Sequence, residues 1–177
     1  MKNRFLLIMS FFFVLGCSDK PKQHRESLET NGLENMEHEL SEPYLNFSKG
    51  YESFNSEMIS NAYTKDAILI NVYNDSEPES YRGRRKINYF FSENLERAKT
   101  ENINLKITFK ISNREALKET ILDNGFYKLE ILDQSKKTIE RYGKFSIVLK
   151  KEADDWKFFV DTNASSNKEE FQNAKSF

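Results

Sequence analysis

The chain of 177 residues has one cysteine and two histidines, and their positions exclude several kinds of chemistry. Both histidines, His24 and His38, lie before residue 43. From residue 43 onward there is neither histidine nor cysteine, which excludes a histidine general base, a thiol nucleophile and a zinc site built from these ligands. We therefore expect no metal and no cofactor.

The chain also lacks a surplus of positive charge. It carries 27 Lys and Arg against 28 Asp and Glu, which gives a formal net charge of −1. Binding to DNA or RNA depends on basic side chains that neutralise phosphates. Nucleic acid is therefore not an expected partner.

One long apolar run is present, at the N-terminus. Lys2 and Arg4 precede the apolar residues 5–15, as in a signal peptide. The run is shorter than the ~20 residues of a membrane-spanning helix. Residues 14–17, Val-Leu-Gly-Cys, resemble the lipobox of bacterial lipoproteins. An ordinary signal peptide with a chance cysteine and a soluble N-terminus are the alternatives.

The lipobox resemblance implies cleavage of residues 1–16 and attachment of acyl chains such as palmitate to Cys17. Buried acyl chains hold a protein on a membrane without spanning it. The implied location is the bacterial cell envelope, and Ser18 favours the outer membrane. Residues 17–42 are polar and predict a flexible stalk, residues 43–165 a single domain, and residues 166–177 a polar tail.

Apolar periodicity predicts two helices in the domain. The first begins near Ser41 and Pro43, and its apolar stripe consists of Tyr44, Phe47, Tyr51, Phe54 and Met58. A strand at 67–74 and a polar loop follow. The second helix begins near Gly83 and has the stripe Ile87, Phe90, Phe91, Leu95 and Ala98.

The rest of the domain has the pattern of strands. Residues 103–111 alternate between apolar and polar, a strand is predicted near 116–122, and residues 123–125 predict a turn or bulge before 126–132. Residues 142–151 and 155–162 predict a hairpin in which Trp156, Phe158 and Val160 share one face. Helices followed by a long meander predict an α+β fold, with helices on one face of a curved antiparallel sheet.

Four segments resemble the nuclear transport factor 2-like (NTF2-like) superfamily, which includes ketosteroid isomerase and SnoaL-like cyclases. They are "AYTKDAILI" (62–70), "GRRKI" (83–87), "NGFYKLEI" (124–131) and "YGKFSIVLKKEADDWKFFVDTNAS" (142–165). The resemblance implies a cone-shaped fold with an apolar pocket between the concave sheet face and the helices. It also implies a homodimer, because sheet-to-sheet dimers are frequent in this fold.

The catalytic groups of the superfamily's enzymes are missing here. The general base of ketosteroid isomerase is an aspartate on the first strand, and that position falls at or beside Asn71. Asparagine does not accept a proton at neutral pH, so the isomerase mechanism does not transfer. The superfamily also includes scytalone dehydratase, and a His–Asp pair of the dehydratase type is likewise absent, because the domain has no histidine.

Five polar residues are candidates for the pocket: Asn71, Tyr73, Tyr127, Tyr142 and Asp161. For Asp161 there are two interpretations, a buried carboxyl with a raised pKa that moves protons, or a strand-end aspartate that binds a loop backbone. The second is favoured, because a lone acid is a weak catalytic constellation. The tyrosines are interpreted as amphipathic core or rim residues, and alternatively as ligand-binding groups.

The basic run 82–86 also has two interpretations. Either it forms an anion site at the start of the helix, or Arg84 pairs with an acid of the preceding loop, such as Glu77 or Glu79, and the other cations are solvated. The second interpretation is favoured. For the whole protein, the favoured hypothesis is a membrane-tethered module that binds a small apolar ligand or a protein partner without catalysis. The alternatives are a small lyase, isomerase or hydrolase that uses Asp161 and pocket tyrosines, and a dimeric structural protein.

Overall fold

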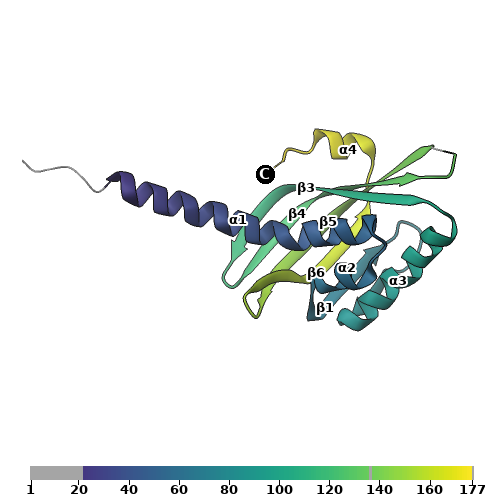
Figure 1. Cartoon of the computed structure of the whole chain (residues 1–177), viewed down its shortest axis with the longest axis horizontal. Coiled ribbons are helices and arrows are strands. Elements are labelled where there is room, and N and C mark those ends of the chain that lie inside the picture. Colours follow the sequence, from purple (N-terminus) through teal and green to yellow (C-terminus); the bar gives the residue numbers. More distant parts are fainter. Residues whose placement is uncertain (1–21, 136, 177) are drawn as a thin grey trace, which may run out of the picture. The chain divides into compact units, whose positions relative to one another are not determined.

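The computed structural model describes residues 22–135 and 137–176, with side chains from residue 36 onward (Figure 1). The predicted signal peptide and Cys17 lie outside the described residues. Backbone contacts divide the chain into residues 1–35 and residues 36–177. The second unit begins seven residues before the predicted domain boundary at residue 43 and contains all the side chains that the structure describes.

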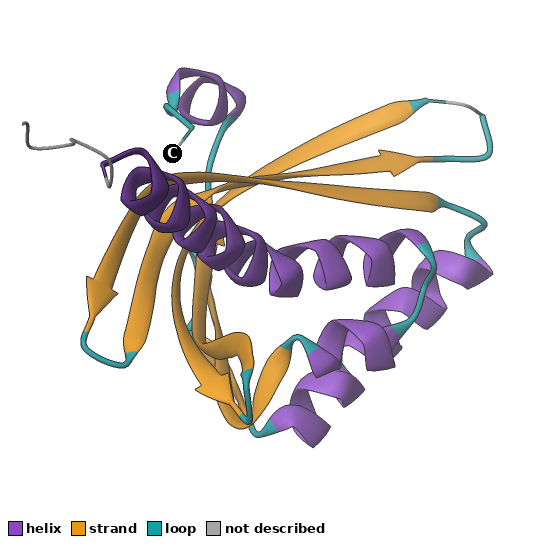
Figure 2. Cartoon of the chain, turned by 60° about the vertical axis from the view of Figure 1, so that its left-hand side comes forward, coloured by secondary structure: helices purple, strands orange, loops and turns teal. Residues whose placement is uncertain are grey.

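Four helices and six strands follow one another along the described chain. They are α1 (Lys22–Glu52), α2 (Ser56–Asn61), β1 (Tyr63–Val72), β2 (Glu79–Arg82), α3 (Arg84–Thr100), β3 (Asn104–Leu117), β4 (Thr120–Leu132), β5 (Thr138–Glu152), β6 (Asp155–Ser165) and α4 (Lys168–Asn173). Helices α2, α3 and the described side chains of α1 lie against one side of a curved sheet, which confirms the predicted α+β architecture (Figure 2). None of the described helices is long and apolar enough to cross a membrane.

The six strands form one sheet in the order β2-β1-β6-β5-β4-β3. The antiparallel sheet predicted from the sequence is in fact mixed, because β1 pairs with β6 in parallel and every other neighbouring pair is antiparallel. The parallel pair is possible because β2, α3 and the strands β3 to β5 separate β1 from β6 in the chain, and parallel neighbours need such a long connection. Residues of β1 and β6 therefore lie side by side in the sheet.

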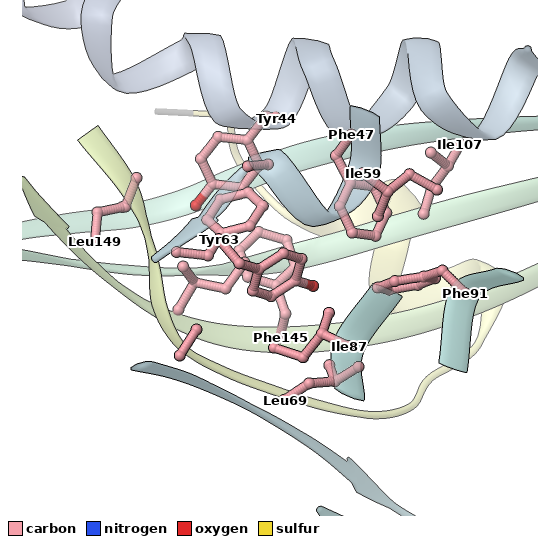
Figure 3. Close-up of a cluster of buried hydrophobic side chains, with 14 of the residues drawn as sticks. Tyr44, Phe47, Ile59, Tyr63, Leu69, Ile87, Phe91, Ile107, Phe145 and Leu149 are labelled. Carbon is pink, nitrogen blue, oxygen red and sulfur yellow. The ribbon is translucent and has the colours of Figure 1, made fainter. Parts of the chain in front are cut away.

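The core lies between the sheet and the helices. Tyr44 and Phe47 point from α1 toward the strands, and Ile87 and Phe91 reach the same space from α3 (Figure 3). The apolar stripe predicted for the second helix is confirmed, since Ile87, Phe91, Leu95 and Ala98 are all buried. Burial of such side chains is the main source of stability of the fold.

Helix α1 is longer than predicted at its N-terminal end and shorter at its C-terminal end. It begins at Lys22, so the segment interpreted as a stalk is helical from there, and Leu40 is only 2% exposed. Pro43 lies inside the helix rather than at its start. The helix ends at Glu52, Phe54 takes a left-handed φ of 53°, and α2 then begins, so Phe54 and Met58 lie outside α1.

The β3–β4 hairpin turns several residues before the predicted site. The strand predicted near 116–122 spans the actual turn, where Lys118 has a left-handed φ of 55°. Residues 123–125 lie inside β4 and face a bulge in β3 between Ile111 and Asn113. Gly125 fits there because a Cβ atom would lie 2.2 Å from the carbonyl oxygen of Lys110. The predicted bulge therefore lies at the correct position along the strand pair, but the extra residue is in β3 and not in β4.

A second irregularity sets which side chains of β6 face inward. Leu149 pairs with Phe158 and Val148 pairs with Val160, so one extra residue stands in β6. Such a bulge shifts the alternation of side chains by one position. Phe158 is buried in the core, but Asp161, and not Val160, is the next residue of β6 toward its C-terminal end that faces the core. The prediction that Val160 shares the face of Phe158 is thus wrong.

The predicted polar tail contains α4, which packs on the other face of the sheet. Asn167 caps this helix by accepting a hydrogen bond from the Glu170 backbone N–H. At the opposite end, Lys110 Nζ donates to the carbonyl oxygens of Phe171 (2.9 Å) and Ala174 (2.8 Å). A lysine at the C-terminal end of a helix satisfies carbonyls that have no partner within the helix.

Candidate functional site

A cavity of about 240 Å³ lies between α1, α3 and the inner face of the sheet, where the resemblance placed a pocket. Its walls are mainly aromatic and aliphatic. The lining residues are Phe47 and Tyr51 from α1, Phe90 and Phe91 from α3, and Leu69, Asn71, Tyr73, Ile107, Phe109, Tyr127, Leu129, Phe145, Ile147, Phe158, Asp161 and Asn163 from the sheet side. Four of the five predicted pocket residues are among them.

Asp161 is the single carboxylate among the lining residues. The Tyr63 hydroxyl donates to its Oδ2 at 2.6 Å, and Tyr63 itself is completely buried on β1. Burial raises the pKa of Asp161 to about 6, although the hydrogen bond from Tyr63 acts in the opposite direction. Asp161 lies in the middle of β6 and binds a side chain, so the interpretation as a strand-end residue bound to a loop backbone is wrong.

Two tyrosine hydroxyls accompany this carboxylate. Tyr51 from α1 and Tyr127 from β4 both line the cavity. Burial raises the pKa of both phenols, and the nearby Asp161 raises them further, so both stay protonated at neutral pH. Within the described part of the chain neither hydroxyl has a hydrogen-bond partner. Both are therefore available to donate to, or accept from, a molecule in the cavity.

Two asparagines provide a second polar group in the wall. Asn163 Nδ2 donates to Asn71 Oδ1 at 2.8 Å across the parallel β1–β6 pair. Tyr73 follows β1, is 42% exposed, and donates to Glu79 at 3.0 Å, so it lies at the edge of the cavity. Asn163 was not among the residues predicted for the pocket, although it lies two residues from Asp161 and therefore on the same strand face.

Tyr142 was predicted as a pocket residue, but the structure places it on the other face of the sheet. In the β4–β5 register Gly143 pairs with Tyr127, which faces inward, so the preceding residue points outward. The Tyr142 hydroxyl donates to Glu140 at 2.6 Å, and its ring contacts Phe171 of α4 at 5.5 Å between centroids. Tyr142 therefore helps to hold α4 and does not line the cavity.

Gly143 provides the space for the Tyr127 ring. A Cβ atom on Gly143 would lie 2.1 Å from Tyr127 Cζ. We expect Gly143→Ala to displace this ring and to lower the free energy of unfolding by about 1 to 3 kcal/mol, the usual cost of overpacking. Urea denaturation measures the change. In the background of Tyr127→Ala, the same glycine substitution is expected to have little effect, and an equal loss in both backgrounds would contradict this explanation.

The basic run 82–86 contains one structural ion pair. Arg84 pairs with Glu152 at the end of β5, and its Nε donates to the Tyr63 carbonyl oxygen at 2.8 Å. Arg84 does pair with an acid, but the prediction of an acid from the preceding loop, such as Glu77 or Glu79, is wrong, because Glu152 lies at the end of β5. The pair joins the start of α3 to the β5–β6 hairpin and leaves this guanidinium engaged with protein groups.

Among the side chains that the structure describes, those of residues 36–135 and 137–176, no three His, Cys, Asp or Glu gather closely enough to hold a metal ion. The polar side chains that line the cavity are the carboxyl group of Asp161, the phenols of Tyr51, Tyr73 and Tyr127, and the amides of Asn71 and Asn163. That set can form hydrogen bonds in both directions and can accept a proton at one position.

No family model matches the sequence, and no curated protein matches it either. Solved structures do match its fold. An NTF2-like protein with a cystatin-like fold from Novosphingobium aromaticivorans superposes with a TM-score of 0.65 at 12% identity, over 90% of this chain and 100% of that one. The protein Aln2 from a Streptomyces species gives 0.63 at 8% identity, over 74% and 90%. An NTF2-like protein of unknown function from Shewanella oneidensis gives 0.57 at 12%, over 72% and 98%.

The chain therefore has the NTF2-like fold, as the sequence resemblance implied. A fold shared at such low identity does not define an activity. The function has to be inferred from the residues of the cavity.

Proposed function

We propose that the protein is a binding module that holds a small amphipathic molecule in this cavity. The observation that carries the proposal is an apolar, largely aromatic wall interrupted by the polar group of Tyr51, Tyr127 and Asp161. Ligand sites commonly combine such walls with a few placed polar groups. The volume of about 240 Å³ is below the ~300 to 1,000 Å³ of sites for drug-sized ligands, so a smaller molecule is expected.

Catalysis by Asp161 is the second candidate, because the structure gives this carboxyl a pKa of about 6. A general base works best with a pKa near the working pH. The hydroxyls of Tyr51 and Tyr127 could stabilise negative charge that develops on a substrate oxygen. The reaction class would be a lyase, isomerase or hydrolase reaction on a small substrate, and Asn71 would orient the substrate without accepting a proton.

Two variants of β4 test binding. Leu129→Trp fills the cavity from its wall, and Phe126→Trp places the same side chain on the other face of the strand. Thermal-shift measurements would screen full-length protein against small cyclic ketones, epoxides, enols and phenylalkyl alcohols. We expect hits that Leu129→Trp abolishes and Phe126→Trp retains. Hits that survive Leu129→Trp, or no hits at all, would contradict a binding cavity.

The same compounds separate binding from catalysis. A binding module leaves each compound chemically unchanged, as checked by mass spectrometry after long incubation. Turnover that disappears in Asp161→Asn would establish the catalytic alternative. Equal turnover by the wild type and by Asp161→Asn would indicate a contaminating enzyme.

We also propose that the protein is tethered to a membrane of the cell envelope through a lipid on Cys17. The support is the lipobox-like sequence and its basic and apolar flank. Cys17→Ser is expected to move the protein from the membrane fraction to the soluble fraction and to leave the fold of residues 43–165 unchanged by circular dichroism. A variant that stays in the membrane fraction would contradict the tether. The homodimer stays a prediction.

A further inference from the structure

Among the described residues, two aspartates are buried on the inner face of the sheet, and their surroundings differ. Asp123 is fully buried and receives two hydrogen bonds from the Arg114 guanidinium, both 2.7 Å long. Asp161 is 7% exposed and receives one hydrogen bond from a neutral phenol. One buried carboxylate thus has a cationic partner, and the other has none within the described part of the chain.

No cationic side chain lines the cavity that Asp161 faces. Its lining residues include no lysine, arginine or histidine. Burial of a carboxylate without a cationic partner costs free energy, and a cation that reaches the carboxylate stabilises it. An entering ligand is therefore the available source of positive charge.

Aromatic rings make up most of the remaining wall. Phe47, Phe109, Phe145 and Phe158 line the cavity together with the two phenols already described. The faces of aromatic rings attract cations, most strongly where water is excluded. An aromatic wall around one carboxylate combines the two features that recognise an organic ammonium group.

We propose that the cavity selects a small amphipathic organic cation, a primary amine on an apolar body, with its ammonium group on Asp161 and its body among the phenylalanines. This inference rests on the proposed binding function and adds the charge and class of the ligand. The ammonium group has three N–H donors, which match the Asp161 carboxylate and the oxygen atoms of Tyr51 and Tyr127.

Among the titratable groups around the cavity, Asp161 is the one that changes charge near neutral pH, because the groups that face it are phenols. They are Tyr63 from β1, Tyr127 from β4, and Tyr44 and Tyr51 from α1, and burial raises the pKa of all four phenols. Helix α3 contributes only Phe90 and Phe91 to the cavity. Affinity for an amine should therefore rise with pH as the Asp161 carboxyl loses its proton, and then become constant.

Three probes with one skeleton test the charge preference. They are 2-phenylethylamine, 2-phenylethanol and phenylacetate, titrated by calorimetry into the purified full-length protein. We expect the amine to bind at least about tenfold more tightly than the alcohol, as for a close buried charge pair, and phenylacetate to bind most weakly. Raising the pH from about 5 to about 7 should strengthen binding of the amine and leave that of the alcohol unchanged, because only the amine senses the Asp161 charge.

Asp161→Asn is the matched variant, since its amide oxygen can still accept the Tyr63 hydrogen bond. It should abolish the preference for the amine, so that the amine and the alcohol bind this variant with similar affinity. An alcohol that binds wild type as tightly as the amine would overturn the inference and leave the binding cavity intact. An amine preference that survives in Asp161→Asn, or that has no pH dependence, would also overturn it. Failure of all three probes would overturn it too. A thermal-shift screen that gives no hits, or hits that survive Leu129→Trp, would remove the proposed function itself.

Discussion

Replacement of Asp123 by asparagine is expected to lower the free energy of unfolding by about 3 kcal/mol, close to the lower end of the range for breaking a buried ion pair. The reason is the position of the carboxylate under α1. Arg114 donates to both of its oxygens at 2.7 Å, and the Tyr44 hydroxyl donates to Oδ2 at 2.8 Å. The Asp123 carboxylate accepts all three hydrogen bonds and has no exposed surface.

An asparagine at this position has almost the same shape as aspartate, but it has no negative charge and one of its two terminal atoms is a hydrogen-bond donor. Its Nδ2 would face the N–H or O–H donors that now bind Oδ2, and the guanidinium of Arg114 would lose its negative partner. The Arg114 side chain is 12% exposed, so water can relieve part of that loss. For this reason the expected effect lies near 3 kcal/mol and not at the upper end of the range.

Glu96→Gln is the matched control. It makes the same change from carboxylate to amide in the Lys99–Glu96 pair on α3, where the two side chains are 45% and 68% exposed. Exposed pairs contribute little, so the change should stay below about 0.5 kcal/mol. Urea denaturation of both variants gives the comparison. Equal effects in the two variants would show that the Asp123 group does not hold α1 to the sheet.

The sequence predicts the elements of this fold best where one periodicity runs without interruption. The stripe from Ile87 to Ala98 has helical spacing over almost the whole of α3, and its buried positions agree with the structure. The alternation from Ile103 to Ile111 likewise identifies β3. Both patterns follow directly from burial of one face of a helix or strand.

The predictions from the sequence differ from the structure where the regular spacing of a strand or helix is interrupted. The bulge in β6 turns Val160 outward and Asp161 inward, but no glycine or proline marks its position. The end of α1 is similar, because Phe54 continues the apolar spacing although its left-handed φ belongs to a turn. Such irregularities arise from packing between distant strands and helices, which a local pattern does not contain.

The candidate site could be predicted from the sequence only in part, because regular strands follow the local pattern and distant pairings do not. Asn71 follows the alternation of a regular strand and could be placed by analogy with the superfamily. Tyr142 lies one residue from the inward-facing position of Gly143, so a shift of one residue moved it to the wrong face. The contact between Tyr63 and Asp161 joins residues 98 positions apart in the chain, and only the parallel β1–β6 pairing brings them together.

Asp161→Asn is expected to stabilise the unliganded protein at neutral pH, the opposite of the effect at Asp123. Its carboxyl has a pKa of about 6 in the folded chain, compared with an ordinary value of 3.8, because it is buried without a cation. That difference corresponds to roughly 3 kcal/mol of destabilisation wherever the group is ionised in both states. The amide removes the charge, while its unpaired N–H₂ group has a cost of its own, so we expect a net gain of about 2 kcal/mol.

The dependence on pH distinguishes this cause from a packing effect. The folded state binds the Asp161 proton more tightly than the unfolded state, so this group destabilises the wild type progressively as the pH rises from about 4 to about 6. The advantage of Asp161→Asn should therefore disappear near pH 4, where the cost of its amide group remains, and should be constant above about pH 7. Asp155→Asn, at an exposed position on the same strand, should change stability by less than about 0.5 kcal/mol at either pH. A loss of stability in Asp161→Asn at neutral pH would mean that the carboxylate has a favourable partner, and the cavity would then need no cationic ligand to neutralise it.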